Sequence, residues 1–231
     1  IQHNHTLLMT LPNELYDIIF THLDPINLLN MRKLSWYTNE YITNKSWWNE
    51  IAITNLKSLE PLSKSIFVNV KIITGDFDDK HFMFLENFVR IIFAFRYEKG
   101  NYGMKRSRLV GAGLVYLKKC KYISLNNCLH LSGFNLKYLE NCIDVNLVCC
   151  DISDLYIRYL SKCKYVDLSG NSLITGECLQ YLPNCVKIGL YRCRNLQNKY
   201  LQYLSNCRVV DISYCYNITY QGLALLTDCR R

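Results

Sequence analysis

Hydrophobic residues recur at a fixed interval through the second half of the chain. A leucine series and two cysteine series return every 21 or 22 residues and stay in register with one another. The leucine series is Leu117, Leu139, Leu160, Leu182, Leu204 and Leu226. The first cysteine series is Cys120, Cys142, Cys163, Cys185, Cys207 and Cys229, and the second is Cys128, Cys150, Cys193 and Cys215, with Asn171 in the remaining place. Series that share one period indicate an internal repeat of one small structural unit.

Each unit predicts one strand and one helical turn. Ile188 and Leu190 alternate with other residues, which is typical of a short strand with one buried face, and Leu201 and Leu204 have the spacing of a helical turn. A single unit cannot cover its own apolar face, so the units are expected to stack into a curved solenoid with a parallel sheet on its concave side. The pattern resembles the cysteine-containing class of leucine-rich repeats, an α/β repeat fold that commonly follows an F-box.

The repeat continues more weakly upstream. Leu85, Phe88, Ile91 and Phe93 occupy the leucine, cysteine, isoleucine and leucine positions of a unit, and a still weaker unit is predicted to start near Leu62. Terminal repeats are expected to be atypical because they face a different neighbour. The predicted solenoid therefore covers residues 59–231, with weak repeats at 62–116 and regular repeats at 117–231.

One unit contains an insertion. The step from Leu85 to Leu117 is 32 residues, and the surplus falls between Phe93 and Leu109. A cationic loop with aromatic residues could grip a phosphorylated or acidic segment, because Arg makes paired hydrogen bonds to phosphate. A solvated, mobile loop is the preferred interpretation. The basic residues of this loop are Arg96, Lys99, Lys105, Arg106 and Arg108.

Three short helices are predicted before the repeats. Pro12 fits the first turn of a helix, and Asp24 with Pro25 separates this helix from the next one. A third helical segment covers residues 34–42. Because three short helices cannot close a core unaided, some of their apolar surface is expected to contact a partner or the first repeat.

This N-terminal stretch resembles the F-box, the motif that docks onto the Skp-type adaptor of Skp/cullin/F-box ubiquitin ligases. The family's opening Leu-Pro-x-Glu-Leu and its paired leucines are matched by Leu11, Pro12, Glu14, Leu15, Leu28 and Leu29. Thr38 and Trp47 depart from the family, which usually has Trp and Leu there. The resemblance implies a three-helix F-box at residues 9–52.

The resemblance also implies which residues bind the adaptor. In the F-box family these are apolar residues at the start of the first helix and around the second. The corresponding residues here are Leu11, Pro12, Leu15, Leu28, Leu29 and Met31. Internal packing within the three-helix unit is the alternative for several of them, and it is the preferred interpretation for Ile18, Ile19 and Phe20.

The sequence contains no recognisable catalytic or metal-binding motif. It has no glycine-rich phosphate loop, no His-Glu-x-x-His, no nucleophile elbow and no Cys-x-x-Cys pair. We therefore expect no catalytic residue, no cofactor and no metal. The F-box resemblance implies the reducing cytosol or nucleus, so the 12 cysteines are interpreted as free thiols that pack as small buried residues.

Charge and hydropathy add little to this picture. The formal net charge is +8, and the positive excess lies in the repeats. A basic surface attracts nucleic acid, anionic lipid or acidic protein, but a charge of this size is also ordinary solvation. No signal-peptide pattern precedes Leu11, and no apolar stretch reaches the roughly 18 residues that span a bilayer. We expect neither a membrane nor nucleic acid as partner. Abundant Asn, Ile, Lys and Tyr suggest an AT-rich genome such as that of a protist or a large DNA virus.

The predicted function is that of a substrate-recognition subunit of a Skp/cullin/F-box ubiquitin ligase, non-catalytic in itself and located in the cytoplasm or nucleus. Its F-box would bind the adaptor, and through it a cullin, while the repeats bind a target protein. The alternative is a scaffold that binds or sequesters the adaptor without delivering a target. Nucleic-acid binding is a third class, whose sign would be affinity that falls steeply with salt.

Outward strand positions of the repeats are the predicted target-binding residues. They are Tyr122, Ser124, Asn126, Asp144, Asn146, Tyr165, Asp167, Ser169, Lys187, Tyr191, Asp211 and Ser213. Asp167 and Asp211 fall at the same place in their repeats, so a structural role at the strand is open for both.

Overall fold

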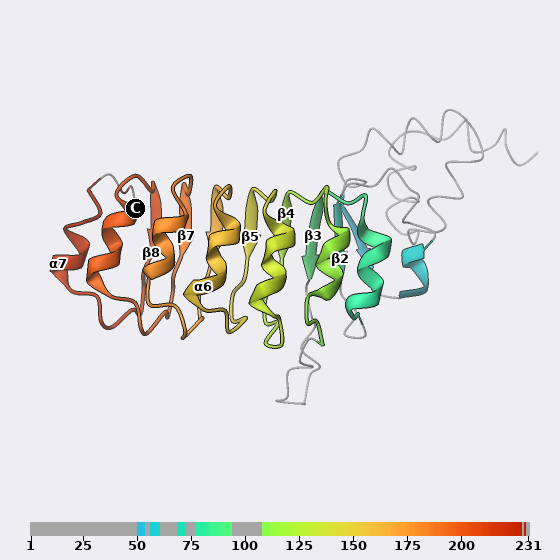
Figure 1. Cartoon of the computed structure of the whole chain (residues 1–231), viewed down its shortest axis with the longest axis horizontal. Coiled ribbons are helices and arrows are strands. Elements are labelled where there is room, and N and C mark those ends of the chain that lie inside the picture. The colour runs from blue at the N-terminus through green and yellow to red at the C-terminus, as the bar shows by residue number, and fades with distance from the viewer. Residues whose placement is uncertain are drawn as a thin grey trace, which may run out of the picture.

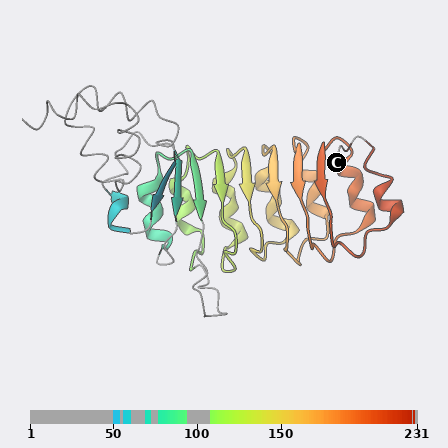
Figure 2. The ribbon, with the colours of Figure 1, turned by 180° about the vertical axis from the view of Figure 1, so that it is seen from behind.

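A single parallel sheet runs through the computed structural model, which describes residues 50–53, 56–60, 69–72, 77–93, 108–227 and 229. Within these residues the sheet has 8 strands in sequence order, each parallel to its neighbours. The strands are β1 (Glu50–Ile53), β2 (Asn69–Ile72), β3 (Arg90–Phe93), β4 (Tyr122–Ser124), β5 (Asp144–Asn146), β6 (Tyr165–Asp167), β7 (Lys187–Gly189) and β8 (Val209–Asp211). Figure 1 shows the helical side of this array and Figure 2 the strand side.

Short helices cover the other face of the sheet. They are η2 (Leu56–Ser58), η3 (Asp79–Leu85), η4 (Ala112–Tyr116), η5 (Gly133–Leu139), α6 (Asp154–Ile157), η6 (Arg158–Leu160), η7 (Glu177–Tyr181), η8 (Asn198–Leu204) and α7 (Tyr220–Leu223). Most of them are 3₁₀ rather than α-helical, as short helical pieces often are. None of the helices in the described ranges has the length and apolarity needed to cross a membrane.

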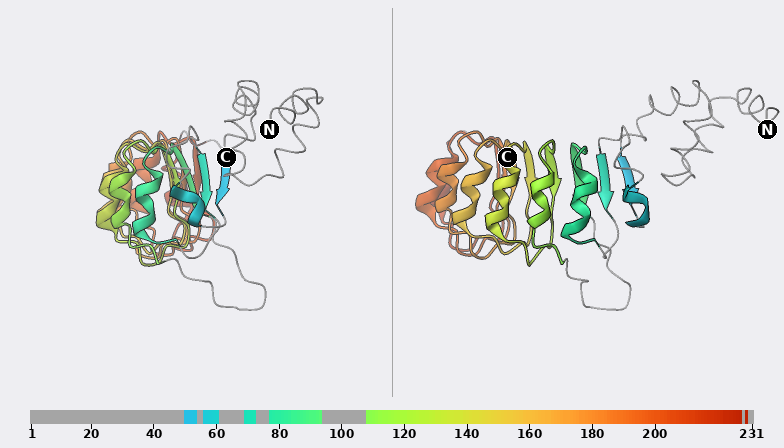
Figure 3. Two further views of the ribbon diagram at one scale, coloured as in Figure 1. Left: turned by 90° about the vertical axis from the view of Figure 1, so that its right-hand side faces the viewer. Right: turned by 45° about the vertical axis from the view of Figure 1, so that its right-hand side comes forward.

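The layered arrangement explains the curvature. Neighbouring strands lie about 4.8 Å apart, whereas helices with their side chains are about 10 Å wide. The helical face must therefore be longer than the strand face, and the sheet becomes the concave side of an unclosed solenoid (Figure 3). The predicted curved parallel sheet is confirmed.

The core lies between the sheet and the helices. Val145, Val166 and Ile188 each contribute the middle, inward side chain of their strand and are at most 2% exposed. The leucines of the series from Leu117 to Leu204 reach the same core from the helical side. Each unit thus buries its apolar face only against the next unit, as the repeat pattern predicts.

The four residues assigned to the weak upstream repeat are buried. Leu85, Phe88, Ile91 and Phe93 are at most 2% exposed, and Ile91 and Phe93 belong to β3. The aromatic rings that replace smaller residues here pack on one another, with the Phe93 ring centroid 5.0 Å from that of Phe77. In this unit, larger aromatic side chains therefore fill the core space that leucine and cysteine fill in the regular repeats.

The sheet begins earlier than the predicted solenoid boundary at residue 59. Strand β1, Glu50–Ile53, pairs with β2, and its first three residues fall inside the range 9–52 predicted for the F-box. No leucine or cysteine series reaches this strand, so the repeat pattern does not reveal it. The three predicted helices before residue 50 and the predicted start of a unit near Leu62 lie outside the described residues.

The second cysteine series joins successive turns of the solenoid. Cys150 Sγ donates to the carbonyl oxygen of Leu125 at 2.9 Å, one turn back. Asn171 takes the same place with an amide, which donates to Leu147 O at 2.8 Å and accepts from Ile152 N at 3.0 Å. Small buried polar groups at this position thus satisfy backbone groups that the sheet leaves unpaired.

Two carboxylates likewise accept hydrogen bonds from backbone N–H groups, in each case where the helical segment of the next unit begins. Asp154 accepts hydrogen bonds from the backbone nitrogens of Thr175 (2.8 Å), Gly176 (3.2 Å) and Cys178 (3.0 Å) in the next unit. Asp79 accepts in the same way from Gly111 and Gly113, across the insertion. These carboxylates fix the position of one unit on the next.

Replacing Asp154 is expected to destabilise the solenoid in a pH-dependent way. Burial alone would raise the pKa of Asp154, but hydrogen bonds from Cys178 and Thr175 outweigh it and lower that pKa. A lowered folded-state pKa stabilises the fold above the unfolded value near 3.8, and this contribution disappears as the pH falls through the folded value. Asp154→Asn should cost about 1–3 kcal/mol at pH 7 and clearly less near pH 3, measured by chemical unfolding. Glu140→Gln, the same loss of charge at an exposed residue, is the control, and equal effects of the two would contradict this role.

The thiols are expected to be free but protected in the folded protein. None of the 12 cysteines is in a disulfide, and only Cys149 and Cys229 are more than marginally exposed. Burial raises the pKa of the Cys163 and Cys193 thiols to about 12, so neither is a thiolate at neutral pH. Ellman's reagent without reductant should find nearly all thiols after denaturation and few of them before it. Recovery of only a few thiols from denatured protein would show that disulfides had formed.

Candidate functional site

The concave face of the sheet brings most of the predicted target-binding residues together. Parallel pairing aligns the first positions of the strands in one row and the third positions in a second row. The first row contains Tyr122, Asp144, Tyr165 and Lys187, and the second contains Ser124, Asn146, Asp167, Gly189 and Asp211. Since neighbouring strands are close, successive residues in a row lie next to one another.

A hollow of about 500 Å³ lies on this face over β5 to β8. Gly189 lies between Asp167 and Asp211 in the second row, and it contributes no side chain. A Cβ atom added to Gly189 would collide with the carboxylate of Asp167, which leans over it. The absence of a side chain at this one strand position therefore opens the hollow and makes room for Asp167.

Part of the polar surface serves the fold. Asp167 Oδ1 accepts from Ser169 N at 3.0 Å, and Asp211 Oδ1 accepts from Ser213 N at 3.0 Å. Asn146 makes the same bond to Val148 N at 3.1 Å. The structural role that the sequence left open for Asp167 and Asp211 is thus observed: one oxygen of each holds the turn that follows its strand.

Asp144 carries charge at a cost to the fold. Burial raises the pKa of Asp144, Arg90 and Lys187 oppose this rise, and the neighbouring charge of Asp167 adds to it. No salt bridge of Asp144 is present within the described ranges, although both cations lie on the same face. A half-buried carboxylate that lacks a direct ion pair can gain one from a bound partner.

Two of the predicted target-binding residues are largely covered. Ser169 is only 7% exposed, and its Oγ accepts from Tyr191 N at 3.2 Å, so it supports the turn while it also lines the hollow. Asn126 is half-buried, and its Oδ1 is fully covered without a hydrogen-bond partner among the described residues. The two-residue alternation of a strand ends before these positions, which is why counting outward positions placed them on the open face.

The remaining predicted sites lie outside the described residues. These are the adaptor-binding residues Leu11, Pro12, Leu15, Leu28, Leu29 and Met31, and the insertion residues Arg96, Lys99, Lys105 and Arg106. Arg108 is described and exposed. The part of the chain that the structure describes contains no group of three or more His, Cys, Asp or Glu residues that could hold a metal ion.

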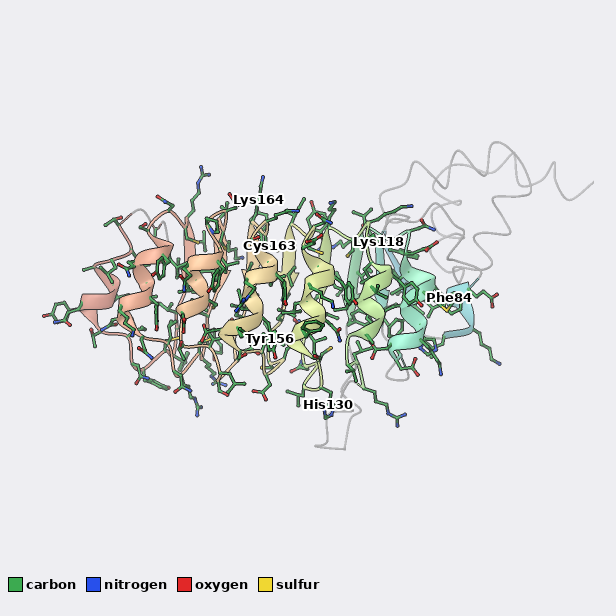
Figure 4. The ribbon with its side chains drawn as sticks, viewed as in Figure 1. Phe84, Lys118, His130, Tyr156, Cys163 and Lys164 are labelled. Atoms are coloured by element: carbon green, nitrogen blue, oxygen red, sulfur yellow. The ribbon has the colours of Figure 1, made fainter. Side chains whose placement is uncertain are left out.

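Some surface residues were not among the predicted sites. Arg90 opens β3 and lies next to Tyr122 in the first row, with its guanidinium 5.8 Å from that ring centroid. The upstream match at Ile91 and Phe93 would have identified it. The edge where strands begin also carries cations: Lys118 and Lys164 lie at the upper edge of Figure 4, opposite His130 at the edge where strands end.

Comparisons with known proteins agree with both parts of the sequence pattern. A family model described as the F-box domain matches residues 8–50. F-box domains typically bind Skp1-type adaptors. The parallel strands of the described residues form a solenoid of the leucine-rich-repeat kind, and the region that matches the F-box domain precedes it. A search of curated proteins finds no match to the chain.

Two similar solved structures are leucine-rich-repeat proteins. One, described as a TLR13–ssRNA13 complex, has a TM-score of 0.52 and 14% identity, and the similarity covers 71% of this chain and 28% of that one. The other, an internalin (InlF) from Listeria monocytogenes, has a TM-score of 0.50 and 12% identity, with 79% and 57% covered. At such identity the likeness concerns the fold alone, and this chain spans well under two thirds of either one.

Neutralising Asp144 is expected to stabilise the protein slightly. A raised folded-state pKa means that the carboxylate penalises folding at neutral pH, and the penalty vanishes below the unfolded value near 3.8. Asp144→Asn should therefore raise the free energy of unfolding at pH 7, and with it the thermal midpoint, and leave both unchanged near pH 3. The gain should be less than about 1 kcal/mol because the carboxylate is only half-buried. Thermal unfolding at both pH values measures this. A lower midpoint at pH 7 would show that Asp144 stabilises the fold.

Proposed function

We propose that this chain is the substrate receptor of a Skp/cullin/F-box ubiquitin ligase. Its F-box binds the Skp-type adaptor, the adaptor links it to a cullin, and the solenoid holds a target protein for ubiquitination. The observation that carries the proposal is the F-box match at residues 8–50 joined to a separate recognition surface. Ubiquitin transfer in this arrangement rests on proximity, which raises the effective concentration of the target at a partner enzyme.

The concave face supports the target-binding half of the proposal. Tyr165 is 40% exposed there, beside the charged groups of Asp144 and Lys187. An exposed ring next to unpaired charges is typical of protein interfaces, where aromatic residues supply contact area and polar groups supply specificity. A protein segment, rather than a small molecule, suits a face that is open along several strands.

The receptor role makes the chain a non-catalytic subunit. The adaptor, the cullin and the transferring enzyme are then partners, and no cofactor is required. The proposed location is the cytoplasm or nucleus, which would be those of a host cell if the AT-rich gene is viral. Twelve cysteines without a disulfide suit a reducing compartment.

Charged substitutions in the F-box are expected to disconnect the receptor. Changing Leu11 and Pro12 to Asp should lower co-purification of adaptor and cullin at least about tenfold, because charges would be buried in an apolar interface. Quantitative mass spectrometry of tagged chains measures both partners. Leu173→Asp, at a residue of the solenoid that is 49% exposed, is the matched control and should retain them.

The same experiment separates the receptor from the sequestering scaffold. A receptor recovers cullin together with adaptor, and the wild-type chain lowers the half-life of a bound target in cells. Recovery of adaptor without cullin, and without any target whose ubiquitination depends on Leu11 and Pro12, would favour sequestration. Absence of adaptor from the wild-type purification would remove the ligase assignment altogether.

A further inference from the structure

An aromatic cluster with a guanidinium at its centre lies just beyond the ends of β7 and β8. We name it the rim cluster, and it consists of Tyr191, Arg192, Tyr214 and Tyr216. The Arg192 guanidinium carbon lies 5.1 Å from the Tyr191 ring centroid and 5.4 Å from that of Tyr214. The Tyr191 and Tyr214 rings meet edge to face at 5.2 Å, and Tyr216 continues the row at 6.3 Å from Tyr214.

The rim cluster is open to solvent. Tyr214 is 53% exposed and Tyr216 is 75% exposed, and Arg192 is exposed as well. The positions equivalent to Tyr216 in earlier units, Leu129, Asp151, Ser172 and Arg194, are exposed even though another unit follows each of them. Exposure is therefore a property of this position in the repeat. Keeping the Tyr216 ring in water there is unfavourable in free energy, because the ring is largely apolar.

The backbone under the cluster adds a second cost. Each turn after a strand needs one residue with positive φ, and Gly170 and Asn127 supply it easily in two of the units. In the last two units this residue is Arg192, with φ 58°, and Tyr214, with φ 61°. Bulky side chains are disfavoured in this conformation, so their presence points to a task that a glycine or an asparagine could not perform.

The chemistry of that task follows from the guanidinium. Arg192 pairs with no carboxylate among the described residues. Its guanidinium lies within cation–π range of two rings and can make paired hydrogen bonds to a carboxylate or phosphate. An exposed Arg beside Tyr rings is the composition typical of interface hot spots.

The space beside the cluster determines how an acidic partner would lie. Tyr214 and Tyr216 are exposed rings beside the guanidinium and offer apolar contact area. Asp211 lies close to them and repels a negative group. An acidic side chain is therefore expected on Arg192, with a neighbouring apolar residue of the same segment on the rings of Tyr214 and Tyr216.

We propose that the rim cluster binds a target segment in which an acidic side chain, a carboxylate or a phosphate, stands next to an apolar one. This assignment rests on the proposed receptor function and names the chemistry of its target. The shared feature is a planar or tetrahedral oxyanion that accepts two hydrogen bonds from Arg192. A carboxylate side chain and a phosphorylated side chain differ in charge, and only the second depends on phosphorylation.

Fluorescence anisotropy with the full chain tests the proposal. Four short labelled peptides differ only at one central position between leucines, which is Glu, phosphoserine, Gln or Lys. We expect the Glu or the phosphoserine peptide to bind about tenfold or more tightly than the Gln peptide, and the Lys peptide to bind most weakly. If only the phosphoserine peptide binds more tightly than the Gln peptide, the target is phosphate-dependent. If the Glu and phosphoserine peptides both bind more tightly than the Gln peptide, any acidic side chain suffices.

Variants at one position separate binding from folding. Arg192→Asn should abolish the preference over Gln, while its unfolding midpoint stays at or above that of the wild type because Asn accepts positive φ more readily. Arg192→Lys should keep only part of the preference, since Lys lacks the planar fork. Arg194→Asn removes the same charge from an exposed residue in the same turn and is the control, with unchanged binding expected.

Several outcomes would overturn the proposal. They are equal affinity for the Glu, phosphoserine and Gln peptides, a preference for Lys, no binding of any peptide, or an unchanged preference in Arg192→Asn. Binding of a Skp-type adaptor is measured on the same preparations and depends on the F-box at residues 8–50. Its failure would contradict the receptor function without altering the peptide result, so the two failures are distinguishable.

Discussion

The structure depends on burial between units that cannot bury themselves. A repeat of 21 or 22 residues supplies one inward residue such as Val166 or Ile188 per strand and a few leucines per helix, and each is covered only by the adjacent unit. Parallel pairing from β1 to β8 also joins each unit to the next by backbone hydrogen bonds. Stability is therefore close to a sum over neighbouring contacts, and the outward strand positions contribute little to it. Those positions are free to change, which makes the concave face suitable for recognition.

Not every polar residue of that face is free. Asp167 and Asp211 each use one oxygen to hold a turn, and Ser169 is buried beneath Tyr191. Asp144 differs, because burial raises its pKa and no local hydrogen bond offsets the cost. Side chains that stabilise the fold and one that destabilises it thus lie on the same face. The second kind marks a binding surface better than exposure does, since most exposed residues carry no such cost.

Sequence periodicity predicted the buried half of the molecule well. The members of the leucine and cysteine series from Leu117 to Cys215 are all buried, because core volume tolerates few residue types. Periodicity could not predict β1, where no series continues, or the buried state of Ser169, where the strand alternation has already ended. It also missed Arg192 and Tyr214, because left-handed turn positions follow backbone geometry and not hydropathy. The F-box resemblance at the N-terminus was confirmed by a family match, yet its adaptor contacts stay a prediction.

Bulky residues with positive φ are unevenly distributed along the repeats. The turn position with positive φ is Asn127, Cys149 and Gly170 in the earlier units, and the bulky residues Arg192 and Tyr214 appear only in later ones. If the repeats had been copied merely to lengthen the core, the cheaper residues would serve equally well in every unit. A local departure from the favoured residue, repeated in two adjacent turns whose side chains then contact each other, is better explained by selection for what those side chains bind. The repeat makes this possible because a strained turn in one unit destabilises only its immediate neighbours.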